Sequence, residues 1–319
     1  MPTATQLSPG QARVVDPILS EHARGYIQPE LVGRSLFPLA PVPMYGGKII
    51  QFDKSAFRLV NSQRAPGTAT KRIQFGYQGD PYAIVPNALE ASVPRELMRD
   101  ASVVPGIDLG TRSINTVLKV LNLGHEVSCA NIARNADSYD AGHTLALSGT
   151  SVWSNAASTP LEDVQNGREA IRASIGVYPN TALVSAKAMK NLRNNAEIIN
   201  RIKYTSRDSV TTDILSNLWE IKNVVVGQAV SADAVTDAFG DVWGPDVLLA
   251  YVAPSGGGDA SANAEEPSYA YTYLIEGMPM VEQPYWDANT KSWVYGVSYD
   301  YTPVLSGMQG GFLISGAGN

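Results

Sequence analysis

The chain has 319 residues, of which 44% are hydrophobic and 17% charged, a composition typical of a folded globular protein and not of a disordered one. No apolar run reaches the ~20 residues that span a bilayer, and no basic segment followed by an apolar stretch opens the chain, so neither a membrane span nor a secretory signal is predicted. The single cysteine, Cys129, excludes an intrachain disulfide framework and favours a reducing compartment.

The net charge of −6 is unevenly distributed along the chain. Residues 45–99 hold eight Lys and Arg against four acids, whereas residues 230–319 hold only Lys291 against eleven acids. These regions are either two solvated faces or two complementary surfaces that meet between copies of the chain. The overall acidity argues against tight nucleic-acid binding, which needs many bases on phosphates.

Residues 1–44 are rich in proline and in scattered apolar residues, which predicts an extended arm with one short helix from about Asp16 to Arg24. From Gly46 onward, the runs Lys48–Asp53 and Arg72–Tyr77 flank a turn-rich stretch, and they predict a long two-stranded hairpin. An arm and a lone hairpin cannot build a core, so we expect both to bury their apolar residues on other copies.

Residues 82–94 are predicted to form a strand, and residues 108–135 the longest helix of the chain. An apolar stripe marks this helix: Ile114, Val117, Leu118, Leu121 and Val127. Residues 137–148 are predicted to form a loop. A second helix over 159–176 has Pro160 in its first turn and Ser158 or Thr159 as its cap.

A strand over 181–184 leads into a helix over 187–202, and Thr212 or Asp213 is expected to cap the next helix. The valine triplet 224–226 is typical of a strand covered on both faces, and residues 247–252 predict another strand. The residues expected to form the core of this region are Ile171, Ile175, Leu183, Val184, Leu192, Ile198, Leu215, Leu218, Val225 and Leu249.

Residues 255–266 are rich in glycine and predict an exposed loop. Strands follow over 269–275 and 293–301, the second pairing with residues 280–285 across the turn 287–290, and a short strand over 310–314 ends the chain. The many aromatic residues of 269–301 are expected to pack within the sheet and at contacts between copies, in preference to a surface that stacks sugars or bases.

The sequence holds no recognisable catalytic, cofactor or metal site. Its three histidines, His22, His125 and His143, lack metal-ligand spacing with one another or with Cys129, and His125 is expected to be structural. The glycine triplet at 256–258 lacks the Lys-Ser/Thr of a phosphate loop, and the run from Asn135 to His143 lacks the closing Glu of a calcium loop. We therefore predict a structural protein without catalysis or cofactors.

The order of these elements resembles the major capsid protein of tailed bacteriophages, an α+β protein of the Hong Kong 97-type fold. The resemblance rests on GGKIIQF (Gly46–Phe52) and RIQFGY (Arg72–Tyr77) as an extended loop, the helix near Leu109 as a spine, and the Asn180–Val184 and Val210–Val230 segments as an axial domain. It implies an N-terminal arm at 1–44, an extended loop at 45–86, a peripheral domain at 87–150 that returns as a hairpin at 269–303, an axial domain at 151–268 and a terminal strand and tail at 304–319.

The resemblance implies hexamers and pentamers of one chain that close an icosahedral shell around double-stranded DNA, without sequence-specific binding and without a membrane. It also implies a virion location after assembly in the host cytoplasm, and as partners a separate scaffold protein, a portal and decoration proteins. Two alternatives stay open: an encapsulin-like compartment that holds cargo enzymes, and an α/β enzyme with an unrecognised site.

The charge asymmetry predicts which residues join the copies. The bases Arg58, Arg64, Lys71 and Arg72 of the hairpin are expected to meet the acidic C-terminal sheet region of a neighbour. The acids of that region are Glu276, Glu282, Asp287 and Asp300. Such exposed pairs contribute ~0–1 kcal/mol each, so they determine how neighbouring copies align more than how tightly the copies bind.

Overall fold

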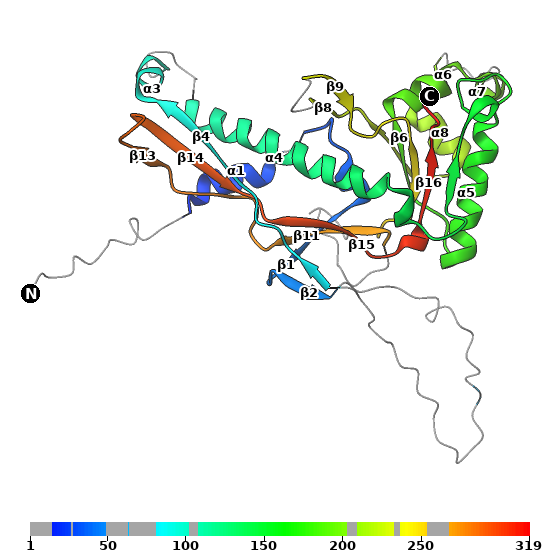
Figure 1. The fold of residues 1–319 in the computed structure, drawn as a ribbon, viewed down its shortest axis with the longest axis horizontal. Helices are drawn as coiled ribbons and strands as arrows, with labels where there is room; N and C mark the ends of the chain where they lie inside the picture. The colour runs from blue at the N-terminus through cyan, green and yellow to red at the C-terminus, as the bar shows by residue number, and fades with distance from the viewer. Residues whose placement is uncertain are drawn as a thin grey trace, which may run out of the picture.

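The computed structural model describes residues 15–26, 28–48, 63, 81–101, 108–202, 209–232, 237–253 and 268–319. A long helix, α4 (Leu109–Ala133), runs through the middle of the molecule, with β4 and β14 beside its first half and a five-stranded sheet with its helices beyond its end (Figure 1). Among the described residues, no helix is long and apolar enough to cross a membrane.

Helix α4 confirms the helix predicted over 108–135. Asp108 begins it by accepting a 2.9 Å hydrogen bond from the amide of Gly110, which satisfies a free donor of the first turn. Four residues of its predicted stripe, Ile114, Val117, Leu118 and Leu121, are buried, and the fifth, Val127, is partly buried. They pack against Val297, Tyr299 and Tyr301 of the sheets below the helix.

The five-stranded sheet forms the centre of the larger end of the molecule. Its strand order is β5 (Thr144–Ala146), β16 (Gly311–Ser315), β10 (Val247–Ala250), β6 (Thr181–Ser185) and β7 (Asn223–Gly227). β10 runs antiparallel to β16 and β6, while the outer pairs β16–β5 and β6–β7 are parallel. The chain's last strand thus lies inside this sheet, outside the 151–268 range predicted for an axial domain.

Both faces of this sheet are covered, because alternate residues of β6, β10 and β16 point to opposite sides. Val184, Leu249 and Ile314 pack with residues of α5 (Pro160–Ile175), α6 (Ala186–Asn194), α7 (Ala196–Ile202) and α8 (Thr212–Trp219). Leu183, Leu248 and Leu313 pack on the other face with Cys129 and Ala133 of α4 and with α2 (Gly33–Leu36). The ten predicted core residues are all buried or partly buried, but on two faces rather than in one cluster.

Several local predictions in this region are wrong. β7 has neighbours on both faces, as predicted, since Val224 and Val226 pack against one core cluster and Val225 against the other, but it is the edge strand and its valines are only partly buried. The helix predicted over 187–202 is two helices that break at Asn195, whose Oδ1 accepts the amide of Glu197 at 2.9 Å. The 137–148 loop contains β5.

The predicted helix caps are also wrong in detail. The residue before α8 is Thr211 rather than Thr212 or Asp213, and it makes no side-chain cap bond. Thr159 lies at the cap position of α5, as predicted, but without a side-chain bond. Pro160 and the acids Glu162 and Asp163 in the first turn suit the start of α5 instead.

Two smaller sheets lie along α4. In one, β14 (Ser292–Ser298) pairs with β12 (Met280–Val281), β13 (Tyr285–Asp287) and β4 (Ala88–Pro94), which confirms the predicted aromatic hairpin. In the other, β11 (Ala270–Ile275) lies between β1 (Leu39–Val42) and β15 (Tyr301–Leu305). Two short helices adjoin these sheets: α1 (Pro17–Gly25), near the predicted bounds, precedes β1, and α3 (Arg95–Ala101) directly follows β4.

Two strand pairs stand apart from these sheets. β2 (Gly46–Lys48) pairs antiparallel with β3 (Pro81–Ala83), so the strand predicted over 82–94 is divided between β3 and β4. The strands predicted over 48–53 and 72–77 and the turn between them lie outside the described residues, apart from Lys48 and Gln63. β8 (Val230–Ala232) and β9 (Phe239–Asp241) form the second pair, beside the five-stranded sheet (Figure 1).

Candidate functional site

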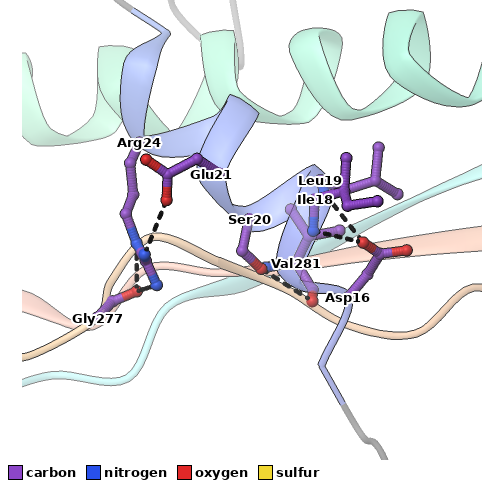
Figure 2. Close-up of polar contacts among 8 residues, drawn as sticks. All are labelled: Asp16, Ile18, Leu19, Ser20, Glu21, Arg24, Gly277 and Val281. Carbon is purple, nitrogen blue, oxygen red and sulfur yellow. Dashed lines mark hydrogen bonds and ion pairs between the residues drawn. The ribbon is translucent and has the colours of Figure 1, made fainter. Parts of the chain in front are cut away.

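The N-terminal segment, residues 15–26 and 28–44, packs on its own subunit. Figure 2 shows its first anchor, where the Asp16 carboxylate accepts the amides of Ile18 and Leu19 at 2.9 and 3.0 Å and so begins α1. The amide of Val281 donates to the Ser20 hydroxyl at 2.9 Å, and Val281 O accepts the amide of Asp16 at 3.0 Å. The first turn of α1 is thus joined to β12.

The end of α1 is attached separately. The Arg24 guanidinium donates to the backbone oxygen of Gly277 from Nε at 3.0 Å and from Nη2 at 2.8 Å (Figure 2). Ala23 is buried against the α4 cluster, whereas Ile18 on the outer side of the helix is 80% exposed. The helix therefore packs Leu19, Ala23 and the polar Ser20 on its own subunit and leaves the apolar Ile18 in solvent.

A buried carboxylate on α4 holds the next part of the segment. Glu126, 1% exposed, accepts the amides of Val32 and Gly33 at 3.0 and 2.7 Å and the indole N–H of Trp243 at 2.6 Å. Burial raises the pKa of Glu126 above its usual range, although these three donors oppose the shift. One side chain thereby joins the N-terminal segment, the spine helix and the five-stranded-sheet region.

The remainder of the segment is part of a sheet and of a core. β1 pairs in parallel with β11 from Leu39↔Thr272 to Val42↔Ile275, and Leu36, Phe37 and Ala40 are fully buried. The expectation that the arm before Tyr45 buries its apolar residues mainly on other copies is therefore wrong for the described part of the arm. Residues 1–14 and 27 lie outside the described residues.

The titratable groups next to Glu126 are suited to packing and not to catalysis. Burial, assisted by the positive charge of Arg34, lowers the pKa of His125 to about 3, so its ring is neutral at pH 7. Burial also raises the pKa of the Cys129 thiol well above its usual value, which disfavours the reactive thiolate. Both side chains are buried, which agrees with the structural role predicted for His125. Among the described residues, no group of His, Cys, Asp and Glu is arranged to hold a metal ion.

The cavity beside this cluster is small. It is lined by Gln28, Leu31, Arg34, Asn122, His125 and Glu126, and its volume of about 30 Å³ suits one or two water molecules. Pockets for small-molecule substrates are about ten times larger or more. The sequence signal that could have revealed this cluster is an acid, Glu126, between the apolar residues of a helix stripe.

The acids predicted to contact a neighbour have different surroundings. Glu276 is exposed at the end of β11, and Asp287 lies in the β13–β14 turn, where Thr290 and Asn289 donate to its carboxylate and lower its pKa. Glu282 is half-buried and accepts the Ser298 hydroxyl at 3.1 Å. These three carboxylates retain solvent contact, so they remain candidates for a contact between copies.

Asp300 does not fit that role. It is 6% exposed and accepts the Tyr45 hydroxyl at 2.8 Å and the amide of Asn87 at 3.1 Å. Its charge is therefore engaged at the base of the β2–β3 pair, and its inclusion among the contacting acids is wrong. Arg58, Arg64, Lys71 and Arg72 lie outside the described residues, so their pairing with these acids stays a prediction.

Eight of the nine aromatic residues of 269–301 divide into two groups, and the ninth, Tyr295, is partly buried. Tyr269, Tyr271, Tyr273, Tyr299 and Tyr301 are buried, which agrees with the predicted sheet packing. Tyr285, Trp286 and Trp293 are 47%, 40% and 39% exposed, and the two tryptophan rings meet edge to face at 5.7 Å. These three lie on the β13–β14 hairpin at the far end of the molecule from the five-stranded sheet (Figure 1).

Comparison with known proteins identifies the family to which this chain belongs. The chain is 34% identical, over 95% of its own length and 97% of the relative's, to the major capsid protein of Burkholderia phage BcepMu. The chain belongs to the family of phage major capsid proteins. A family model described as phage major capsid protein E also matches residues 138–294. A structural role in a capsid shell, within the virion, follows from membership of this family.

Solved structures agree with this membership. The chain superposes with a TM-score of 0.84 on a phage-related protein from Bordetella bronchiseptica, with 56% identity over 97% of this chain and 99% of that one. Its fold is also similar to the mature capsid of bacteriophage PhiM1 (TM-score 0.51, 11% identity, covering 91% and 88% of the two chains) and to an encapsulin from Synechococcus elongatus (0.51, 12%, 98% and 91%). The predicted capsid fold class is confirmed.

Proposed function

We propose that this capsid protein assembles as hexamers and pentamers into an icosahedral shell that encloses double-stranded DNA. The observation that carries the proposal is the 34% identity with a phage major capsid protein over nearly the whole of both chains. The acidic net charge of −6 favours enclosure of DNA without sequence-specific contacts, because tight binding needs many phosphate contacts. A scaffold protein, a portal and decoration proteins complete the proposed assembly in the host cytoplasm.

The direct test is to express the full chain and image the products by negative-stain electron microscopy. Closed shells of uniform diameter are the expected result. Particles recovered from phage-producing cells should protect genome-length DNA from nuclease. Small discrete oligomers under all conditions, with or without phage proteins present, would contradict the proposal.

An encapsulin-like compartment is the second candidate, and the fold likeness to the Synechococcus elongatus encapsulin supports it only at 12% identity. The two functions differ in contents. Particles that co-purify with a defined cargo enzyme and contain no protected DNA would favour the compartment. The greater identity to a phage capsid protein favours the phage shell.

We further propose that Arg58, Arg64, Lys71 and Arg72 meet Glu276, Glu282 and Asp287 of a neighbouring copy. The support is the charge asymmetry of the sequence, together with the solvent contact of all three acids. Replacing Arg64 and Arg72 by Glu should block assembly while leaving the subunit folded, and 1 M salt should weaken wild-type assembly because charges then act over only ~3 Å. The control is Arg112→Glu with Lys119→Glu, which makes the same change of charge at two exposed positions of α4.

A further inference from the structure

Among the described residues of the larger end of the molecule, the β8–β9 hairpin carries the most exposed large apolar side chain, Phe239. Its base is buried, because Ala229 and Val242 are 5% and 7% exposed and the Val242 amide donates to Ala229 O at 3.0 Å. Beyond that base, Val230 is 47% exposed and Phe239 is 79% exposed. Two strands alone are marginally stable in water, so an open apolar hairpin needs a second surface.

The described part of its own subunit does not supply that surface. The register Val230↔Asp241 and Ala232↔Phe239 places Val230, Ala232 and Phe239 on one face, and all three are exposed. On the opposite face, a Cβ added to Gly240 would meet no atom within 4 Å. In Figure 1 the hairpin stands to one side of β6, with α6 and α7 on the other.

The charges of the hairpin identify the chemistry of its partner. Residues 230–241 contain Asp233, Asp237 and Asp241 and no base. Among the described acids, Asp237 is exposed, and Asp241 pairs with Lys187 of α6 at 3.0 Å. A complementary surface would therefore be apolar at its centre and basic around it.

The chain itself carries such a surface on α6 and α7. Helix α6 has three exposed bases at three-residue spacing, Lys187, Lys190 and Arg193, and no acid. Helix α7, which contacts α6, adds exposed Arg201 and leaves Ile199 41% exposed. Of the carboxylates that the structure describes, none forms an ion pair with Lys190 or Arg193.

We infer that the β8–β9 hairpin of one copy docks on the α6–α7 surface of a second copy, with Phe239 against Ile199 and Asp237 among Lys190 and Arg193. The two surfaces differ, so the contact is head to tail, and a head-to-tail contact gives a ring when its rotation closes and an open filament when it does not. This inference rests on the proposed assembly into hexamers and pentamers. It assigns one contact that joins neighbouring subunits within such a ring.

Cysteine cross-linking of the full chain tests the contact. Cys129 is buried, so cysteines introduced as Phe239→Cys and Ile199→Cys are the accessible pair. Oxidation of the double variant should give a ladder of covalent multimers, because each copy offers one cysteine to each neighbour. Phe239→Cys with Ile18→Cys, which is 80% exposed on α1, is the matched control and should give no ladder.

The outcomes separate this contact from the proposed shell. Wild-type particles together with a double variant that forms no ladder would overturn the contact and leave the shell intact. Dimers from Phe239→Cys alone would show hairpins pairing with each other and would also overturn it. A ladder from small oligomers, with no closed particle of the unmodified chain, would support the contact and contradict the shell.

Charge exchange provides a second test. Asp237→Lys, or Lys190→Glu with Arg193→Glu, should raise the concentration needed for assembly, and combining all three changes should restore it. Phe239→Ala should raise that concentration by about ten- to hundred-fold, because it removes a large buried apolar contact. Glu30→Lys, an exposed acid elsewhere, is the control and should leave assembly unchanged. Failure of the triple variant to recover, with subunits folded, would count against the pairing.

Discussion

The five-stranded-sheet region and the N-terminal segment are stabilised by different means. The sheet is buried on both faces by apolar side chains, among them Val184, Leu249 and Leu313, which are at most 1% exposed. Residues 15–26 and 28–33 combine a few apolar contacts, such as those of Ala23 and Val32, with localised polar contacts through Ser20, Arg24 and Glu126. Apolar burial is distributed over many residues, whereas a buried polar contact depends on a single partner. This first part of the segment, up to Gly33, should therefore loosen without unfolding the sheet.

The largest expected effect is in the sheet region. Leu215→Ala removes a fully buried side chain of α8 and should lower the free energy of unfolding by ~2–5 kcal/mol. Leu218→Ala on the same helix is the matched comparison, and it should cost less because Leu218 is only partly buried. Chemical denaturation of the two variants measures the difference. Equal costs would show that burial on α8 does not determine its contribution.

The second effect is a loss of stability as the pH falls. It arises from His125 on α4, the helix that contacts both regions. His125 has a pKa of about 3 in the folded chain and near 6.5 when unfolded, so the unfolded state binds the proton first as pH falls. Its contribution to stability is complete above pH 6.5 and declines toward pH 3, by up to ~1.4 kcal/mol per pH unit. Denaturation between pH 7 and 4 should show a shallower slope for His125→Gln. An unchanged slope would contradict the assignment.

The third effect should destabilise the N-terminal segment more than the five-stranded sheet. Glu126→Gln keeps the shape of the side chain but replaces an acceptor oxygen with a donor, and one lost buried hydrogen bond costs ~1–3 kcal/mol. Amide exchange at Val32 and Gly33 should accelerate more than exchange in β10. Uniform acceleration in both places would show that the segment and the sheet unfold together.

Glu126 also has a pH dependence of opposite sign to that of His125. Its pKa is raised in the folded chain, so the folded state retains the proton at a higher pH than the unfolded state does. Its contribution is complete below the usual glutamate value of 4.5 and is lost as pH rises through the raised folded value. Glu126→Gln should remove this dependence in the same denaturation series.

The smallest effect concerns the start of α1. Asp16→Ala removes the cap that accepts two amides and should cost ~0.5–2 kcal/mol, confined to the segment. Asp16→Asn, which keeps an acceptor oxygen, should restore most of the loss. Exchange at the amides of Ile18 and Leu19 is the measurement. Identical behaviour of the alanine and asparagine variants would exclude the cap as the cause.

Much of the larger end could be predicted from sequence because its signals are local and repeated. Helix α5, strand β6 and strand β10 each combine a capping or terminating residue with an apolar pattern of the right period. The features that the sequence did not predict were missed for physical reasons too. An edge strand and a central strand of three valines look alike in sequence, and only the partners of β7 show that it lies at the edge.

The candidate contact residues were less predictable. A count of charges finds an acidic C-terminal region but cannot distinguish exposed Glu276 from buried Asp300, whose carboxylate is taken up by Tyr45, 255 positions away. The β8–β9 hairpin was missed because its strands are three residues each, too short to give a period. Exposure of Phe239 is a property of what surrounds it, which the sequence does not contain.

The sequence alone determined most of the longer elements, their order and the absence of a recognisable catalytic motif, because caps, apolar periods and turn residues act over a few neighbouring positions. The tertiary structure decided where the N-terminal segment lies. Its scattered apolar residues need some surface, and from sequence a neighbour's surface and its own subunit's are equivalent. Contacts such as Val32 to Glu126, 94 positions apart, exist only once the spine helix and the sheet have brought their donors and acceptors together.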